Sequence, residues 1–274
     1  MNDFLKNFYW ALNEVRDKNP IVHSITNFVS MNDCANVCTA FGGSPIMAFC
    51  SDEVEEVTTI ADSLVLNIGT PDKDRFDAIK ISGKKANEKG IPIIFDPVGV
   101  GVSQFRKNGV RHILDRVKVS IIKGNVSEIK FITGIVPNMN KGVDAVDILD
   151  ESNFEMVKKL AKELNCVVAV TGKEDYITDG RRYLKIKRGS QFLKKVSGTG
   201  CMTSQLMACF SAVESDMFLV AVYGILTMNL CGEIAEKSLK DGEGVCKFKI
   251  NLLDAISNLH KTCIEDMEGI EFGI

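Results

Sequence analysis

The hexapeptide IPIIFD, residues 91–96, consists of apolar side chains up to its last residue, an aspartate. Runs that are apolar on both faces are typical of strands in a parallel sheet that helices cover on both sides. Three other largely apolar runs end in glycine: SLVLNIG at 63–69, VSIIKG at 119–124 and CVVAVTG at 166–172. Stretches with helical spacing separate the four runs, at residues 72–89, 103–116 and 151–164. This alternation predicts strand–helix–strand units and a doubly wound α/β fold with a mostly parallel sheet flanked by helices.

The pattern changes after the fourth run. The segment YITDGRRYLKIK, residues 176–187, has Asp179-Gly180 between two alternating halves, which is a strong hairpin signal. We therefore expect antiparallel strands along one edge of the sheet. From Gly200 to about Met267 the sequence reads as helical, and its apolar run at 217–230 is too short to span a bilayer. Because no repeat or linker divides the sequence, we expect one domain over residues 1–274.

Composition narrows the class of protein. The chain of 274 residues is 45% hydrophobic and 25% charged, with a net charge of −3 and both signs dispersed. These values are ordinary for a globular protein and give no basic face for nucleic acid or an anionic membrane. The nine cysteines form no CxxC pair, and the first residues contain no signal-peptide core. We therefore expect a reduced, cytoplasmic protein that binds neither nucleic acid nor a membrane.

Polar residues follow the predicted strands, and ligands of open α/β sheets bind at the carboxyl ends of strands. Asp96 ends the second run, and Glu128 lies just after the third, in GNVSE. Carboxylates at neighbouring strand ends suit magnesium, which keeps several waters and is shared with substrate phosphates. The residues alone leave alternatives open. Asp96 could cap a turn or a helix, and Glu128 could be a first-turn helix residue in a cap formed with Asn125 or Ser127.

The glycine-rich stretch SGTGC, residues 197–201, leads into a helical apolar pattern. Gly198 and Gly200 permit backbone conformations and close ligand approach that a Cβ atom would hinder. The N-terminus of a helix favours anions, and it is expected to lower the pKa of the Cys201 thiol from its reference of about 8.5. The alternative is an ordinary entry into a helix, with Cys201 as one more buried cysteine.

A further polar cluster lies within residues 20–49. Ser30 is the predicted N-cap of a helix of about ten residues, and His23, Asn27 and Met47 are expected in or beside the flanking loops. We interpret His23 as a structural hydrogen-bonding residue rather than a catalytic one. Met47 could fill the core or line a pocket for a flat, soft ligand.

Seven stretches together resemble the hydroxyethylthiazole kinases, a branch of the ribokinase-like superfamily. They occur in the family's order between Asn19 and Ser204: NPIVHSITNFVSMNDCANV, GGSPIMA, LVLNIGT, FDPVGVG, IIKGNVSEI, AVTGKEDYITDG and VSGTGCMTS. The resemblance implies a ribokinase-like fold. It also implies transfer of the γ-phosphoryl group of ATP, with Mg²⁺, to 4-methyl-5-(2-hydroxyethyl)thiazole in thiamine biosynthesis or salvage.

The resemblance also implies an assembly, a homotrimer with active sites between subunits. On that basis we expect the region of Asn27 and Met47 to face Gly198 and Cys201 across a subunit boundary.

By motif match, the resemblance assigns binding roles to single residues. The assignments are Lys123 and Thr171 to ATP, Met47, Gly198 and Asn27 to the thiazole, and Asp96 and Glu128 to magnesium, largely through water. At position 123 the family often has arginine. A lysine supplies the charge without a two-pronged grip on phosphate.

Cys201 occupies the position where the wider superfamily usually has an aspartate that accepts the alcohol proton. The resemblance therefore makes Cys201 the catalytic base. A thiol at its reference pKa is only a few per cent ionised at about pH 7. A weak base can suffice, because phosphoryl transfer depends mostly on positioning and electrostatics.

Three other functions fit the same features. One is a ribokinase-like kinase for a pyrimidine alcohol or a sugar, and another is a nucleotide-dependent dehydratase of hydrated NAD(P)H on the same scaffold. The third is a thiazole- or thiamine-binding module without catalysis.

Overall fold

The computed structural model describes residues 2–134, 151–260 and 269–273. In this part of the chain, one nine-stranded sheet has the order β2-β1-β3-β4-β5-β6-β7-β8-β9. The strands from β2 to β6 pair in parallel, and β6 to β9 pair antiparallel. The strands are β1 Ile21–Ile25, β2 Ser44–Ile46, β3 Ser63–Asn67, β4 Ile93–Asp96, β5 Ile121–Asn125, β6 Val167–Thr171, β7 Asp175–Thr178, β8 Tyr183–Ile186 and β9 Ile270–Gly273. The predicted doubly wound sheet with an antiparallel edge is confirmed.

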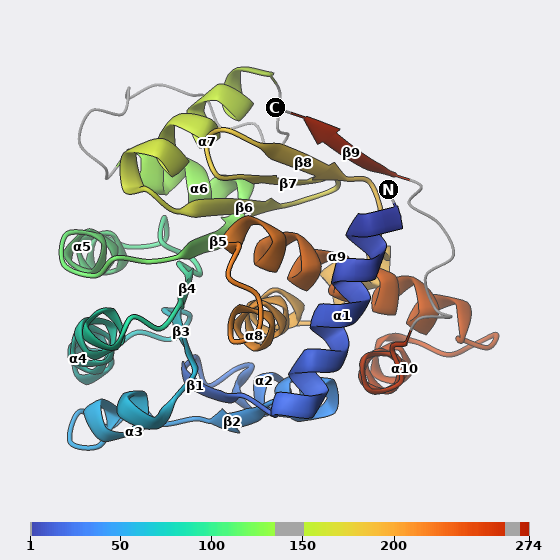
Figure 1. The fold of residues 1–274 in the computed structure, drawn as a ribbon, viewed down its shortest axis with the longest axis horizontal. Coiled ribbons are helices and arrows are strands. Elements are labelled where there is room, and N and C mark those ends of the chain that lie inside the picture. Colours follow the sequence, from blue (N-terminus) through green and yellow to red (C-terminus); the bar gives the residue numbers. More distant parts are fainter. Residues whose placement is uncertain (1, 135–150, 261–268, 274) are drawn as a thin grey trace.

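Helices cover both faces of the sheet (Figure 1). One face carries α3 Val54–Ile60, α4 Lys73–Lys89, α5 Gln104–Leu114, α6 Val126–Thr133 and α7 Glu151–Leu164. The other carries α1 Asn2–Lys18, α2 Met31–Phe41, α8 Thr199–Ser211, α9 Met217–Lys237 and α10 Val245–Ser257. A short 3₁₀ helix, Gln191–Lys195, precedes α8.

Local signals set the helix ends where the sequence placed them. The Asp72 side chain accepts a hydrogen bond from the Arg75 backbone N–H at 2.7 Å and starts α4. Gly90, with φ of 76°, ends the same helix in the left-handed conformation that glycine adopts most easily. Asn125, the last residue of β5, is the N-cap of α6, where its side chain accepts a hydrogen bond from the Glu128 backbone N–H.

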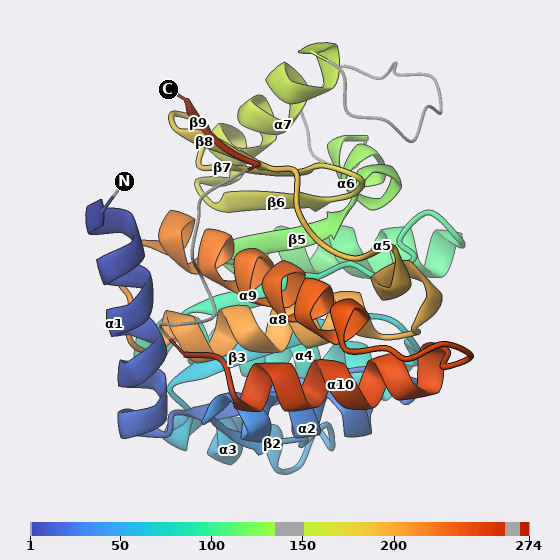
Figure 2. The same ribbon diagram turned by 90° about the vertical axis from the view of Figure 1, so that its right-hand side faces the viewer.

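The helical layer on the second face forms the larger core. Figure 2 shows α8, α9 and α10 side by side, and contacts join α9 to each of the other two. Helix α9 is long and apolar enough to cross a membrane, but 78% of its apolar window is buried inside the protein. It is therefore a core helix, and each large side chain that it buries contributes about 1.5–3 kcal/mol.

The sequence does not predict three of the observed strands: β1, β2 and β9. β1 and β2 lie in the region where only loops and a helix were expected, so the placement of His23 in or beside a loop is wrong: it lies inside β1. β1 is hidden because His23 and Ser24 interrupt its apolar pattern, although both are buried. β9 has four residues and pairs with β8, so its extended form depends on that distant strand.

Candidate active site

Helix α8 begins at the carboxyl ends of the central strands, as the SGTGC stretch predicted. Gly198, its N-cap residue, has φ of 92°, and a Cβ atom added there would lie 2.8 Å from Cβ of Ser30. Glycine is therefore required at position 198 by both conformation and space. Gly200 lies inside the first turn, where a Cβ atom would approach the Lys123 ammonium at 3.1 Å.

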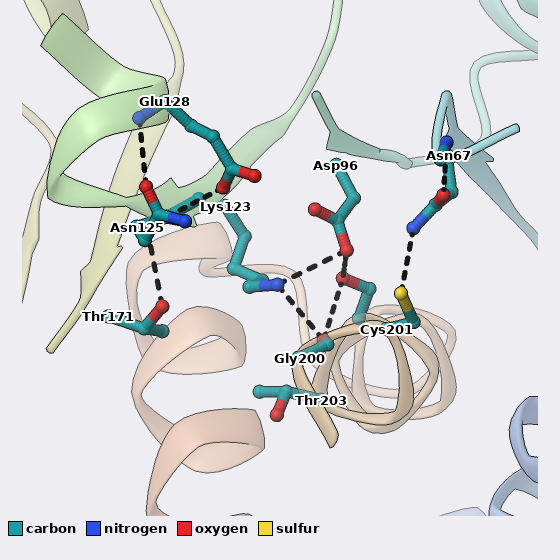
Figure 3. A network of polar contacts seen from close by, with 12 residues as sticks. Asn67, Asp96, Lys123, Asn125, Glu128, Thr171, Gly200, Cys201 and Thr203 are labelled. Carbon is teal, nitrogen blue, oxygen red and sulfur yellow. Dashed lines mark hydrogen bonds and ion pairs between the residues drawn. The ribbon is translucent and has the colours of Figure 1, made fainter. Parts of the chain in front are cut away.

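The Cys201 sulfur lies on the first turn of α8 and is held by two amide groups. Asn67 Nδ2 is 3.2 Å from Cys201 Sγ, and Asn27 Nδ2 is 3.3 Å from it. Asn67 is the last residue of β3, and Figure 3 shows its side chain directed at the sulfur. The thiol is almost completely buried, with 8% of the residue exposed.

The expected lowering of the Cys201 pKa is wrong. Burial raises the pKa of the thiol above its usual value, and the negative charge of Asp96 raises it further. The charge of Lys123 and hydrogen bonds from Ser30 and Asn27 act in the opposite direction without reversing the shift. The helix N-terminus alone does not decide the pKa, because the sulfur is removed from water.

Lys123 and Asp96 form a buried ion pair beside the thiol (Figure 3). Their side chains are 4% and 0% exposed, and Nζ lies 3.1 Å from Asp96 Oδ2. Nζ also donates to the backbone carbonyl of Gly200 at 3.0 Å, and Ser204 Oγ donates to Asp96 Oδ2 at 2.8 Å. Burial lowers the pKa of Lys123, but the charge of Asp96 above all raises it, and the net shift is upward. Lys123 therefore stays protonated and ties two strand ends to α8.

Glu128 is a first-turn residue of α6 and forms a cap with Asn125, one of the alternatives that the sequence allowed. Its backbone N–H donates to Asn125 Oδ1, while its Oε2 accepts from the Asn125 backbone N–H, both at 2.9 Å. Its Oε1 accepts from the backbone N–H of Gly99 at 2.9 Å. Burial raises the pKa of Glu128, and the charge of Asp96 raises it further. The two carboxylates thus share one rim of the sheet.

This rim fits a magnesium ion that keeps part of its water shell. Asp96 Oδ1 is buried and has no hydrogen-bond partner within the part of the chain that the structure describes. A bound cation would satisfy that oxygen and offset the repulsion between Asp96 and Glu128. Across the described residues, no group of three His, Cys, Asp or Glu side chains could form a fuller protein cage. Two carboxylates suit magnesium, which is bound in part by substrate phosphates.

A cavity of about 230 Å³ opens beside the start of α8. Thr171, at the end of β6, lines it together with Asn125, Thr199, Gly200 and Lys194. The first turn of α8 thus offers backbone N–H groups between the cavity and the carboxylate rim, an arrangement that favours an anion. Lys123 is directed at Asp96 and Gly200, away from Thr171 (Figure 3).

Asp175 supports the wall of this cavity. Its Oδ1 accepts from the backbone N–H of Gly172 at 3.0 Å, and its Oδ2 accepts from Asn229 Nδ2 at 2.7 Å. Burial raises the pKa of Asp175 to about 6. The residue therefore fixes the turn that directly follows Thr171.

Three candidate residues remain: His23, Met47 and Asn27. His23 is structural, as interpreted: its ring nitrogens contact Thr58 Oγ1 at 2.9 Å and the Ala48 carbonyl at 3.0 Å, and burial lowers its pKa to about 4. Met47 follows β2 and is half-buried. Asn27 contacts Cys201 within one chain, so these two residues do not face each other across a subunit boundary. That the region of Met47 faces another subunit stays a prediction.

Sequence reasoning missed two side chains of the site. The sequence places Asn67 at a strand end without predicting a role for it, and it predicts none for Ser204. The signal for Asn67 was a polar amide at the end of an otherwise apolar run, and the signal for Ser204 was its spacing of four from Gly200 on a helix. Neither signal names the partner atom.

The family model described as the hydroxyethylthiazole kinase family matches residues 12–262. A hydroxyethylthiazole kinase of Clostridium beijerinckii is 47% identical over 265 residues, which cover 95% of each chain. One of Clostridioides difficile is 43% identical over 264 residues, 96% of this chain and 99% of that relative.

Solved structures agree with the sequence relatives. The hydroxyethylthiazole kinase protein of Pyrococcus horikoshii superposes with a TM-score of 0.87 and 34% identity, covering 98% of this chain and 100% of that one. A ribokinase-like superfamily protein of Enterococcus faecalis has a TM-score of 0.62 at 11% identity, covering 86% of each chain, and shows the shared fold alone.

Proposed function

Because the chain belongs to the hydroxyethylthiazole kinase family, we propose that it phosphorylates 4-methyl-5-(2-hydroxyethyl)thiazole with ATP, a reaction of thiamine biosynthesis and salvage. One observation carries the proposal beyond the family relationship. Cys201 lies on the first turn of α8, directly after Gly200, whose carbonyl accepts a hydrogen bond from Lys123, the ion-pair partner of Asp96. A proton acceptor, an anion-favouring helix start and a cation site at one point are what phosphoryl transfer to an alcohol needs.

ATP would enter by the cavity at Thr171. Its phosphates would reach the first turn of α8, where the backbone N–H groups of that turn and the positive end of the helix dipole favour negative charge. Lys123 would act on the nucleotide mainly through its charge, because its Nζ is already bonded to Asp96 and Gly200. Asp96 and Glu128 would hold Mg²⁺, which on binding would neutralise developing charge on the phosphoryl oxygens.

The thiazole would lie on the other side of Cys201, near Asn27, Gly198 and Met47. In the reaction, the Cys201 thiolate takes the hydroxyl proton and becomes a thiol. The alcohol oxygen forms a bond to the γ-phosphorus, and the bond from that phosphorus to the bridging oxygen breaks, with its electron pair leaving on ADP. The thiol then returns its proton to water. Gly198 lets the start of α8 pack directly against Ser30, because no Cβ atom fits between them.

The proposal predicts a defined product. Purified protein with Mg²⁺, ATP and the thiazole alcohol should yield the thiazole monophosphate and ADP in equal amounts, identified by mass. Hydroxymethylpyrimidine and ribose, offered in parallel, should react far more slowly. ATP consumption with hydrated NADH and no phosphorylated alcohol would identify a dehydratase instead, and binding of the thiazole without ATP turnover would identify a binding module.

We also propose that the protein is a homotrimer with the thiazole pocket close to the subunit contacts. The loops on either side of Asn27 and Met47 expose apolar side chains, namely Phe28, Val29 and Phe49 at 61%, 67% and 37%. Phe28 and Phe49 meet edge to face at 5.7 Å, and both rings lie over the Arg75 guanidinium. Apolar groups gathered beside a site favour coverage by another subunit.

The trimer gives a mass prediction. Light scattering should report three times the chain mass of 30.1 kDa. Phe28→Glu should reduce the mass and weaken thiazole binding, because a charge would be buried in the contact. Ile250→Glu, at an exposed position on α10, is the matched control and should leave the mass unchanged. A fully active monomer would contradict the proposal.

We further propose that the protein is a single cytoplasmic domain. The described strands form one sheet that spans the sequence from β1 to β9. Within the described ranges the cysteines form no disulfide, which fits a reducing compartment.

A further inference from the structure

The two amides at the Cys201 sulfur have fixed orientations. Asn67 Oδ1 accepts from the backbone N–H of Gly69 at 2.9 Å, so Asn67 Nδ2 must face the sulfur. Asn27 Oδ1 accepts from the backbone N–H of Ser30 at 3.1 Å, so Asn27 Nδ2 faces the sulfur as well. A flip of either amide would set an NH₂ group against a backbone N–H. The backbone therefore decides that both groups present N–H donors to the sulfur.

The amides also support each other. Asn27 Nδ2 donates to Asn67 Oδ1 at 2.9 Å, which joins the end of β3 to the segment after β1. Asn67 is completely buried at the end of a strand whose other members are mostly apolar. Burying an amide is unfavourable unless its hydrogen bonds are made. An arrangement that uses two buried amides to donate to one sulfur points to a function at that sulfur.

From this geometry we infer that Asn67, together with Asn27, is a positioning residue that stabilises the thiolate form of Cys201. Its part in catalysis rests on the proposed function, in which that thiolate accepts the alcohol proton. Hydrogen bonds donated to a charged atom are about twice as strong as those between neutral groups, so the donor pair favours the thiolate over the thiol.

The two charged groups nearest Cys201 have opposite effects on its ionisation. Asp96 on β4 disfavours the thiolate and Lys123 on β5 favours it, and these two groups are paired with each other. Cys34 on α2 would disfavour a second thiolate, but burial raises the pKa of Cys34 to about 12 and keeps it neutral. The charge of Lys123 and the hydrogen bonds from Ser30 and Asn27 counteract burial, and the position of Asn67 Nδ2, 3.2 Å from the sulfur, adds a second amide donor to this set.

The direct test is the titration of Cys201 in the protein without nucleotide or metal. Cysteine labelled with ¹³C at Cβ reports ionisation by chemical shift, and the Cys201 signal is assigned by its loss in Cys201→Ser. Asn67→Ala should raise the pKa of Cys201 by about one unit, a tenfold loss of thiolate at a given pH below it. Asn67→Asp keeps the acceptor for Gly69 but sets a carboxylate beside the sulfur, so its shift should be larger.

Ser63→Ala is the matched control for disturbed packing. Ser63 is buried at the start of the same strand and also bonds to α8, through the Ala208 carbonyl at 2.9 Å. The control should leave the Cys201 titration where it is. An unchanged titration in both Asn67 variants, or an equal shift in Ser63→Ala, would overturn the inference.

Kinetics supply the second readout. In Asn67→Ala, kcat should fall about tenfold near neutral pH and recover as the pH rises toward the new pKa, since the remaining thiol then ionises. In a Cys201→Ala background, Asn67→Ala should have no further effect on kcat. A loss that stays constant with pH, or that persists in that background, contradicts action through Cys201.

The two proposals fail separately. The titration needs no substrate, so a shifted pKa in a protein that does not phosphorylate the thiazole would refute the function alone. Thiazole phosphorylation with an unmoved Cys201 titration would refute this inference alone.

Discussion

Asp96→Ala is expected to destabilise the protein by about 3–5 kcal/mol and to lower kcat by about 10²–10³ or more. The loss of stability follows from Lys123, whose ammonium would remain buried without its carboxylate. The loss of activity follows because one of the two carboxylates proposed to hold Mg²⁺ is removed. Chemical denaturation and turnover with Mg·ATP measure the two effects on the same preparation.

A second variant separates the loss of stability, caused by the unpaired Lys123 charge, from the loss of activity. In Asp96→Ala combined with Lys123→Met, the buried pair is replaced by apolar side chains, a change that is often neutral or stabilising. The double variant should therefore recover most of the lost stability while its activity stays low. If Asp96→Ala alone keeps native stability, the ion pair is not what balances the Lys123 charge. If the double variant regains activity, Asp96 is not needed for the reaction.

Cys201→Ala is expected to lower kcat toward the small end of the roughly 10²–10⁴-fold range of general base catalysis. Burial and Asp96 raise the pKa of the thiol, so at neutral pH only a small fraction of the proposed base is ionised. The cavity, the start of α8 and the two carboxylates remain in the variant. For the native protein, kcat should rise with pH toward the raised pKa of the thiol.

Cys201→Asp decides between a base and a buried structural cysteine. A carboxylate is ionised near neutral pH and would accept hydrogen bonds from Asn27 and Asn67, so activity should be kept or raised. Its pH profile should shift to lower pH, because a carboxyl group ionises well below a thiol. A structural cysteine predicts the reverse, since an uncompensated buried charge destabilises the protein. An inactive, unstable Asp variant beside a fully active Ala variant would rule out the base.

Local pattern was enough for much of the fold. The four apolar runs became β3 to β6, and Asp179-Gly180 became the turn between β7 and β8, because both signals depend on neighbouring residues. The start of α8 was equally local: only glycine fits the backbone of position 198. By contrast, β1 and β9 are strands because of the partners they pair with, and their own sequences contain no strand pattern.

The sequence by itself determined which residues meet, because parallel strands bring their carboxyl ends to one rim. It thereby grouped Asp96, Lys123 and Glu128, and its ordered motifs identified the family and added Cys201 to the site. Tertiary structure alone decided what these groups do to one another. Lys123 pairs with Asp96 across 27 residues of sequence, and Asn67 donates to Cys201 across 134. The direction of the thiol's pKa shift depends on burial and on charges brought together by the fold, and neither is a property of the segment that contains the cysteine.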